Sequence, residues 1–175
     1  MKFLLKFIVY ILAFFIFLFV FLPKENIYFK GEELLEKQGV VISDELLQEN
    51  LYALKISGAD VYFKGVYFAN INKLDISSFI FFTKIELNSL RFAPAISKMA
   101  PTPISNISVT HSILDPLKAK IEGFSEYGNI NGYIDFIEKK IFINFDANSK
   151  MKSNYSNVLR MMKQKDGRYT YEYNY

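Results

Sequence analysis

The stretch DVYFKGVYFANI, residues 60–71, decides the fold class of this chain. It holds two apolar, strand-forming runs on either side of Gly65, and glycine accepts the backbone angles of a tight turn without strain. Two such runs joined by a short turn are the sequence pattern of a β-hairpin. The stretch therefore predicts two antiparallel strands, and the rest of the chain extends this pattern in both directions.

Segments in which apolar and polar residues alternate precede and follow the hairpin. A period of two is typical of a strand that buries one face. The alternation recurs at residues 52–57, 85–92, 107–110, 117–122, 130–136, 141–145 and 169–175. Short strands at such regular spacing indicate an antiparallel sheet. Between residues 85 and 92 the apolar phase shifts by one position, which predicts a β-bulge near Asn88 and Ser89.

Two helices interrupt the strand pattern. Residues 31–38 have acidic residues in the first turn and are followed by Gly39, a common residue at a helix end. Near the C-terminus, apolar residues recur every three or four positions, which predicts a helix near residues 153–165. We therefore expect a mainly β fold, in which a curved antiparallel sheet carries a few helices.

The N-terminal run FIVYILAFFIFLFVFL, residues 7–22, has no polar break and follows Lys2 and Lys6. At about 1.5 Å rise per residue, residues 3–22 span about 30 Å of hydrocarbon. The residues after the run lack the small side chains that signal-peptide cleavage requires. Residues 1–22 therefore predict an uncleaved transmembrane anchor. Its apolar side chains include Phe7, Ile8, Phe14, Phe15, Phe17, Phe19, Phe21 and Leu22.

The lysines ahead of the anchor predict its orientation. By the positive-inside rule, the N-terminus lies in the cytoplasm and residues 23–175 lie beyond the membrane as a single domain. The chain has no Cys or Trp and is rich in Lys, Asn, Ile, Phe and Tyr, which fits a bacterial coding sequence and is compatible with a periplasm. We expect a single-pass protein of the bacterial inner membrane with a periplasmic domain.

The sequence offers no clear catalytic or metal site. His111 is the only histidine and lies in phase with Ile107 and Val109, so we expect it on the inner face of a strand. No nucleophile motif or phosphate-binding glycine loop accompanies it. Carboxylate pairs such as Asp135 and Glu138 are better explained as turn residues than as an acid–base pair. We therefore expect no enzyme, no metal site and no cofactor.

The exported part is close to neutral once Lys2 and Lys6 are set aside, and it has no basic block. Nucleic acid is therefore not an expected partner. Instead, the exported part holds more apolar and aromatic residues than a one-sided sheet needs. One interpretation is core packing. The other is that one sheet face stays partly open to acyl chains or another protein, or that the last strand pairs with a neighbouring subunit. The candidate residues are Phe79, Phe81, Phe82, Tyr169, Tyr171, Tyr173 and Tyr175.

Several phrases along the chain carry a resemblance to known envelope proteins. They are LPKEN at 22–26, GADV at 58–61, ANINKLDI at 69–76, ISNISV at 104–109 and LDPL at 114–117. Together with the anchor and the helix ending at Gly39, this order resembles the type II secretion system protein N family and the wider AsmA-like group of bacterial proteins. The resemblance implies an inner-membrane anchor bearing a bent, groove-forming antiparallel sheet in the periplasm, without enzymatic residues.

Two functions follow as hypotheses. The leading one is a non-enzymatic accessory or scaffold component of a multi-protein envelope machine, such as a secretion system or flagellar motor, with other proteins as partners. The alternative is an AsmA-like lipid-binding or lipid-handling module whose apolar groove holds acyl chains.

Overall fold

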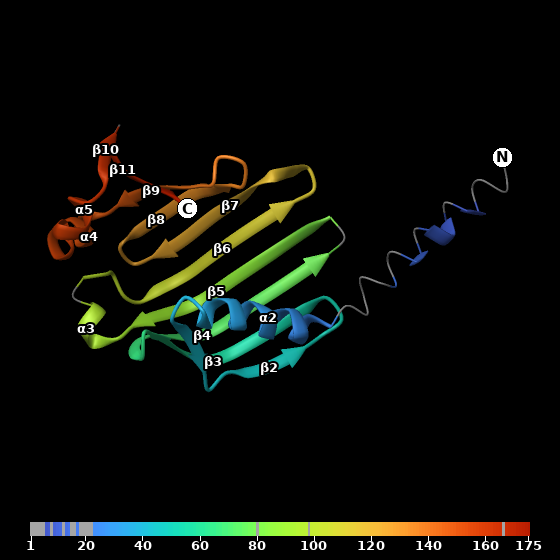
Figure 1. Ribbon diagram of the computed structural model, residues 1–175. Coiled ribbons are helices and arrows are strands. Elements are labelled where there is room, and N and C mark those ends of the chain that lie inside the picture. The colour runs from blue at the N-terminus through green and yellow to red at the C-terminus, as the bar shows by residue number, and fades with distance from the viewer. Residues whose placement is uncertain are drawn as a thin grey trace.

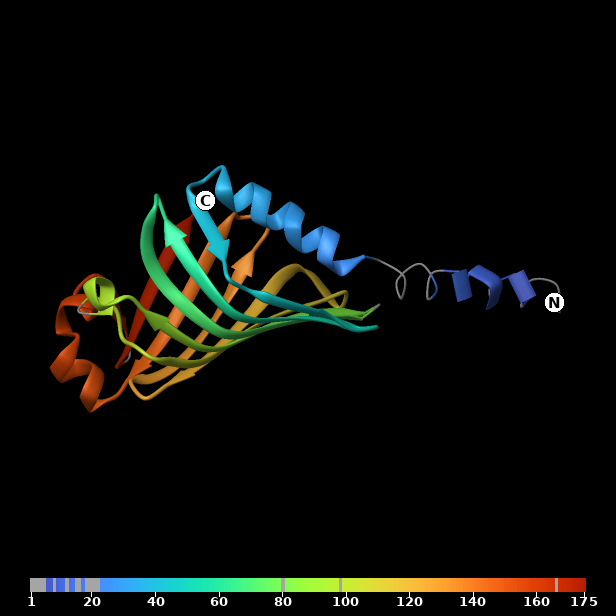
Figure 2. The same ribbon diagram turned by 90° about the horizontal axis from the view of Figure 1, so that it is seen from below.

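The chain folds into one antiparallel sheet of eleven strands with a few short helices. The computed structural model (Figure 1) describes residues 6–7, 9–11, 13–14, 17, 23–79, 81–97, 99–165 and 167–175. The mainly β, antiparallel fold predicted from the alternating segments is confirmed. Figure 2 shows that the sheet is strongly curved, with α2 lying across its hollow side.

The elements follow one another with short connections. The strands are β1 (Val40–Ser43), β2 (Leu46–Glu49), β3 (Ala53–Phe63), β4 (Val66–Phe79), β5 (Phe82–Phe92), β6 (Ile104–Ser112), β7 (Asp115–Ser125), β8 (Gly128–Asp135), β9 (Lys140–Ala147), β10 (Lys163–Lys165) and β11 (Arg168–Asn174). The helices are α2 (Lys24–Glu36), α3 (Pro94–Ser97), α4 (Ser149–Asn154) and α5 (Ser156–Leu159).

The sheet is a meander through most of its width. Its order is β1-β3-β4-β5-β6-β7-β8-β9-β11-β10, and β2 pairs with the first half of β3. The predicted hairpin is formed by β3 and β4, with Lys64 and Gly65 at the turn. Both turn residues have positive φ, 50° and 78°, which is the geometry that a tight two-residue hairpin requires.

The two faces of the sheet differ in chemistry. One row across the inner face consists of Leu54, Ile76, Ile85, Val109 and Ile121. The neighbouring row on the outer face consists of Lys55, Asp75, Glu86, Ser108 and Glu122. Lysine–carboxylate pairs also lie on the outer face, among them Lys84–Glu86 at 2.8 Å and Lys120–Glu122 at 2.6 Å. Because the outer face carries charges, only the inner face can supply a core.

A crease crosses four neighbouring strands at Gly58, Asn72, Ser89 and Ser105. The strand register places these four residues opposite one another on β3, β4, β5 and β6. None of them, however, forms a ladder pair with the residue opposite. Gly58 and Ser89 have φ of 73° and 58°, a left-handed conformation that interrupts the alternation of a strand. Apolar residues beyond the crease therefore return to the inner face, as Ala59 does beside Leu54.

The phase change near Ser89 has the same origin. The register between β5 and both neighbours is the same before and after Ser89, so no extra residue is inserted. The predicted bulge near Asn88 and Ser89 is therefore wrong. A single left-handed residue changes the phase instead.

The first helix is longer than predicted. It begins at Lys24, directly after Pro23, and Gly31 lies in its middle rather than at its start. The prediction of a helix at 31–38 is wrong about the start, because proline is well tolerated before the first turn and one exposed glycine costs a helix only about 1 kcal/mol. Gly39 does end this segment, with a φ of 82°.

The predicted helix at 153–165 is also wrong in its bounds. Two short helices, α4 and α5, lie at 149–159 and are separated at Tyr155, whose φ and ψ are −130° and 36°. Residues 163–165 form β10 and pair with β11. The apolar periodicity correctly indicated the buried side, since Val158 and Met162 pack on the core cluster of Met151 and Leu159. It could not show the backbone break.

The predicted anchor lies largely outside the described residues. Phe7, Phe14 and Phe17 are described as helical and exposed. The remaining anchor residues named above, Ile8, Phe15, Phe19, Phe21 and Leu22, lie outside the described residues. None of the helices in the described part of the chain combines the length and the apolar character that a membrane crossing requires.

Candidate functional site

A groove runs between α2 and the inner face of the sheet. Its volume is about 410 Å³, which falls within the range of about 300–1,000 Å³ typical of small-molecule sites. The sheet contributes mainly aliphatic side chains from β1, β3, β4 and β5. The lining residues from the sheet are Ile42, Leu54, Leu74, Ile76, Ser78, Thr83 and Ile85.

One face of α2 forms the other wall. Residues 24, 27, 28, 31, 32 and 35 line the groove, and their spacing of three or four positions places them on one side of a helix. Although α2 is thirteen residues long, it has no buried residue. Gly31 leaves open space, because a Cβ added there would meet nothing within 4 Å. The groove is therefore a gap under a loosely seated helix.

Contacts at the two ends hold α2 in place. At its start, the Lys24 amide donates to Glu49 Oε1 at 3.1 Å, and the Lys24 ammonium lies 3.6 Å from the same carboxylate. After its end, the Gly39 carbonyl accepts a hydrogen bond of 2.6 Å from the Lys64 amide. Tyr28 packs on the cluster of Leu54 and Ile56 at the groove floor.

The groove holds few polar groups. At one end the Ser78 and Thr83 hydroxyls satisfy each other at 3.1 Å. On the α2 side, the buried Tyr28 hydroxyl makes no hydrogen bond of good geometry with any described residue. Burial, with the Glu45 and Glu32 carboxylates nearby, raises the pKa of Tyr28 above its usual range. The hydroxyl is therefore neutral and lies beside the Glu45 carboxylate without a hydrogen bond of good geometry.

Glu32 shares this environment. Burial raises the pKa of its carboxyl group, and the neighbouring charges of Glu45 and Glu36 raise it further. The α2 wall thus offers a phenol and a carboxyl group with a raised pKa beside a mainly aliphatic space. Such a site can accept an apolar chain and place one polar group at Tyr28.

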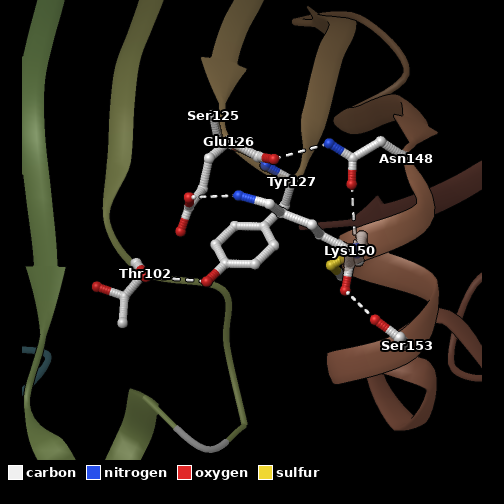
Figure 3. A network of polar contacts seen from close by, with 8 residues as sticks. Thr102, Ser125, Glu126, Tyr127, Asn148, Lys150 and Ser153 are labelled. Atoms are coloured by element: carbon white, nitrogen blue, oxygen red, sulfur yellow. Dashed lines mark hydrogen bonds and ion pairs between the residues drawn. The ribbon is translucent and has the colours of Figure 1, made fainter.

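The other end of the inner face is closed by α4 and α5. Met151 and Leu159 are 1% and 5% exposed and pack with Phe145. The apolar hollow beside Met151 measures about 140 Å³, and a more open hollow of about 400 Å³ lies between α5 and β10–β11. Figure 3 shows how the β7–β8 turn holds α4: the Asn148 side-chain amide donates to the Glu126 carbonyl at 2.7 Å. The Tyr127 hydroxyl also donates to the Thr102 carbonyl at 3.4 Å. These contacts are structural, and this region is core.

His111 lies on the inner face, as its phase predicts, but outside the groove. Its Nε2 is 3.1 Å from the Pro116 carbonyl, and its ring lies edge-on to Phe136 at 5.6 Å. The described residues contain no cluster of His, Cys, Asp or Glu able to hold a metal ion.

The predicted candidate residues occupy two places, neither of them in the groove. Phe79 and Phe82 stack at 4.9 Å beside the exposed Phe81, at the β4–β5 turn. Tyr171, Tyr173 and Tyr175 are exposed at the C-terminal end. Tyr169 instead packs on the C-terminal core cluster.

The sequence predicted an open apolar face of the sheet as a possible groove, but not that α2 forms its other wall. The signal was the three-to-four spacing of Ile27, Gly31 and Leu35, which becomes visible only if the helix starts at Lys24. Comparison of the chain with protein-family models, curated proteins and solved structures found no match. The resemblance to the type II secretion system protein N and AsmA-like proteins therefore stays a prediction.

Proposed function

We propose that this protein is a non-enzymatic lipid-handling module that holds an acyl chain between α2 and the inner face of its sheet. The observation that carries the proposal is the groove of about 410 Å³ with its aliphatic lining. Each methylene group transferred from water into such a site contributes about 0.8 kcal/mol. An acyl chain is thus the ligand whose chemistry best fits this lining.

The Tyr28 hydroxyl determines how the ligand is oriented in the groove. It is buried beside the Glu45 carboxylate but makes no hydrogen bond of good geometry, so a carbonyl or ester oxygen of a lipid would complete its hydrogen bonding. The nearby Glu32 and Glu45 carboxyl groups disfavour a phosphate at this point. The ligand therefore presents an uncharged oxygen to Tyr28.

The apolar run at residues 7–22 supports a location at a membrane. As part of the proposal, this run is a single-pass anchor in the bacterial inner membrane, with the N-terminus in the cytoplasm and residues 23–175 in the periplasm. An AsmA-like role, in which a short anchored sheet shields acyl chains, agrees with this arrangement.

Native mass spectrometry of the full-length chain, released from membranes in a mild detergent, tests the proposal. The wild-type protein should carry a co-purified lipid, and Ile85→Glu should lose it because a carboxylate would enter the groove. Thr110→Glu is the matched control. Thr110 lies on the outer face between Lys84 and Lys120, so the same charge is tolerated there. Equal lipid loss in both variants, or no lipid in the wild type, would contradict the proposal.

A second candidate function is a scaffold role in an envelope assembly such as a secretion system or flagellar motor, and the edge of β11 favours it. β10 pairs only with residues 168–170, so residues 171–174 have no described strand on that side. An uncovered edge with exposed tyrosines can receive a strand from another protein. Photocrosslinking from Tyr171 in cells should then give protein adducts, and the absence of such adducts would count against this role.

A further inference from the structure

Exposed apolar side chains project from one end of the sheet. The β2–β3, β4–β5, β6–β7 and β8–β9 turns all lie at the end where the chain enters α2 (Figures 1 and 2). Leu114, Ile137 and Phe81 are 93%, 68% and 60% exposed. We call this set the apolar rim; its members are Leu51, Phe81, Ile113, Leu114, Phe136 and Ile137.

The rim is continuous rather than a scatter of single residues. Three contacts join its turns in order: the Tyr52 ring stacks on Phe79 at 5.3 Å, the Ile113 amide donates to the Phe81 carbonyl at 3.0 Å, and the Phe136 amide donates to the Leu117 carbonyl at 3.0 Å. A contiguous exposed apolar surface marks an interaction site, whereas isolated exposed apolar residues need no explanation.

The N-terminal run joins the domain at this same end. The Lys24 amide is bonded to Glu49, which lies just before the β2–β3 turn, so Pro23 is held beside the rim. Residues 7–22 are apolar throughout and end one residue before Pro23. In the sequence, no residue lies between this run and Pro23.

The turns at the opposite end carry charges at their tips. They include Asp44 and Glu45 between β1 and β2, Lys64 between β3 and β4, and Glu126 between β7 and β8. Exposed apolar residues such as Val66 and Met161 also occur at this end, but charged tips lie among them. At the rim, the β8–β9 turn carries Glu138 and Lys139, whereas the β2–β3, β4–β5 and β6–β7 turns carry no charged residue. The two ends of the sheet therefore differ in how many of their turns are charged.

From these observations we propose that the apolar rim inserts into the surface of a lipid bilayer. The occupant is lipid rather than a protein because the apolar N-terminal run enters the domain at the rim. Interfacial amphipathic helices bury their apolar face about 5–10 Å into the boundary between headgroups and acyl chains, and the rim side chains would enter the same boundary. Lys139, which follows Ile137 and Glu138 at the β8–β9 turn, is long enough to reach the headgroups.

Insertion of the rim has a consequence for the groove. Ser78 and Thr83 line the groove and lie just behind Phe79 and Phe82, so this end of the groove would open toward the bilayer. This consequence rests on the proposed function, but the insertion of the rim does not.

The full-length chain allows a direct test because it contains no cysteine. Single cysteines at Leu114 and Ile137 report on the rim, and those at Val66 and Met161 are matched exposed controls at the opposite end. Each variant is labelled with an environment-sensitive fluorophore and placed in phosphatidylcholine nanodiscs that contain nitroxide-labelled lipid. The rim labels should lose most of their fluorescence to the nitroxide, and the control labels should keep theirs.

Equal quenching at both ends, or none at the rim, would overturn the proposal. Adding Ile85→Glu separates it from the lipid-handling function. That substitution should remove the lipid from the groove and leave quenching at Leu114 and Ile137 unchanged. The two proposals can therefore fail independently.

Discussion

The helix α2 and the helix pair α4 and α5 lie on the same apolar face of the sheet, but they pack on it to different degrees. The thirteen residues of α2 include none that is buried, and the groove beneath them measures about 410 Å³. The much shorter α4 and α5 bury Met151 and Leu159; the apolar hollow between Met151 and the sheet measures about 140 Å³, and a more open, polar hollow of about 400 Å³ lies between α5 and β10–β11. Helix length therefore does not decide which part of the face becomes core.

The difference lies in how the helices are attached. α4 has a side-chain N-cap, in which Asn148 Oδ1 accepts from the Met151 amide at 3.1 Å, and Met151 itself is inserted into the core. α2 follows Pro23, has no side-chain cap, and is fixed near its two ends. A helix held near its ends and through Tyr28 leaves room for a ligand along the rest of its face, whereas a helix with a side chain fully inserted into the core becomes part of the core.

The largest expected effect is a difference in the free energy of unfolding between a substitution in α4 and one in α2. Met151→Ala should lower the free energy of unfolding by about 2–5 kcal/mol, because it leaves a cavity in a closed core. Leu35→Ala under α2 should cost much less, since Leu35 is 38% exposed and already borders open space. Urea unfolding of the detergent-solubilised chain measures both. Similar losses would show that α2 is packed as tightly as α4.

The capping difference predicts a smaller effect. Asn148→Ala should cost about 1 kcal/mol, because it removes the cap of α4 and the hydrogen bond to the Glu126 carbonyl. Ser153→Ala, which removes only an exposed hydroxyl bonded locally, serves as the control. Unfolding midpoints in urea distinguish the two. An Asn148→Ala variant as stable as the control would contradict the role of this cap.

Replacing a glycine by alanine should change the stability in opposite directions in α2 and in β8. Gly31→Ala should stabilise the protein by up to about 1 kcal/mol, because alanine favours a helix and its Cβ meets nothing within 4 Å. Gly132→Ala in β8 should destabilise it, since the added Cβ would collide with the Phe142 carbonyl. Thermal unfolding of both variants provides the measurement. Destabilisation by Gly31→Ala would mean that the groove is narrower than described.

The smallest effects concern pH. The raised pKa of Glu32 means that the folded chain holds this proton more tightly, so its stabilisation is present at low pH and is lost as pH rises through the raised pKa. Asp135 has the opposite sign. Hydrogen bonds from the Glu138 and Ile137 amides, together with Lys118, lower its pKa, so its stabilisation is lost as pH falls through the lowered value.

Glu32→Gln should therefore flatten the stability profile on its neutral side, and Asp135→Asn should flatten it on its acid side. Thermal midpoints measured between about pH 3 and pH 7 test both substitutions. A profile that neither variant changes would contradict these assignments.

The fold was largely predictable from the sequence because strand alternation is a local signal. The β3–β4 hairpin and the one-sided sheet follow from it directly. The crease does not, because it depends on residues in four strands falling into line, which only the register of the sheet reveals. One part of it, the phase change near Ser89, was visible in the sequence but was assigned to a bulge.

The candidate site was less predictable than the fold. The exposed phenylalanines and C-terminal tyrosines could be recognised by their apolar surplus. The structure places the phenylalanines at the β4–β5 turn and the tyrosines along or just after β11, with Tyr169 packed on the core. The groove depends on where α2 begins and on how loosely it sits. Treating Gly31 as a helix boundary hid the face that lines the groove.

The most direct test of the account is to fill the groove without disturbing the fold. Gly31→Leu places a branched side chain in the open space under α2, and Gly31→Ala is its matched control. Native mass spectrometry of both full-length variants, released from membranes in the same detergent, counts the bound lipid. The account predicts that Gly31→Ala keeps its lipid and Gly31→Leu loses it at undiminished stability. Equal lipid occupancy in the two variants would contradict the assignment of this groove as the acyl-chain site.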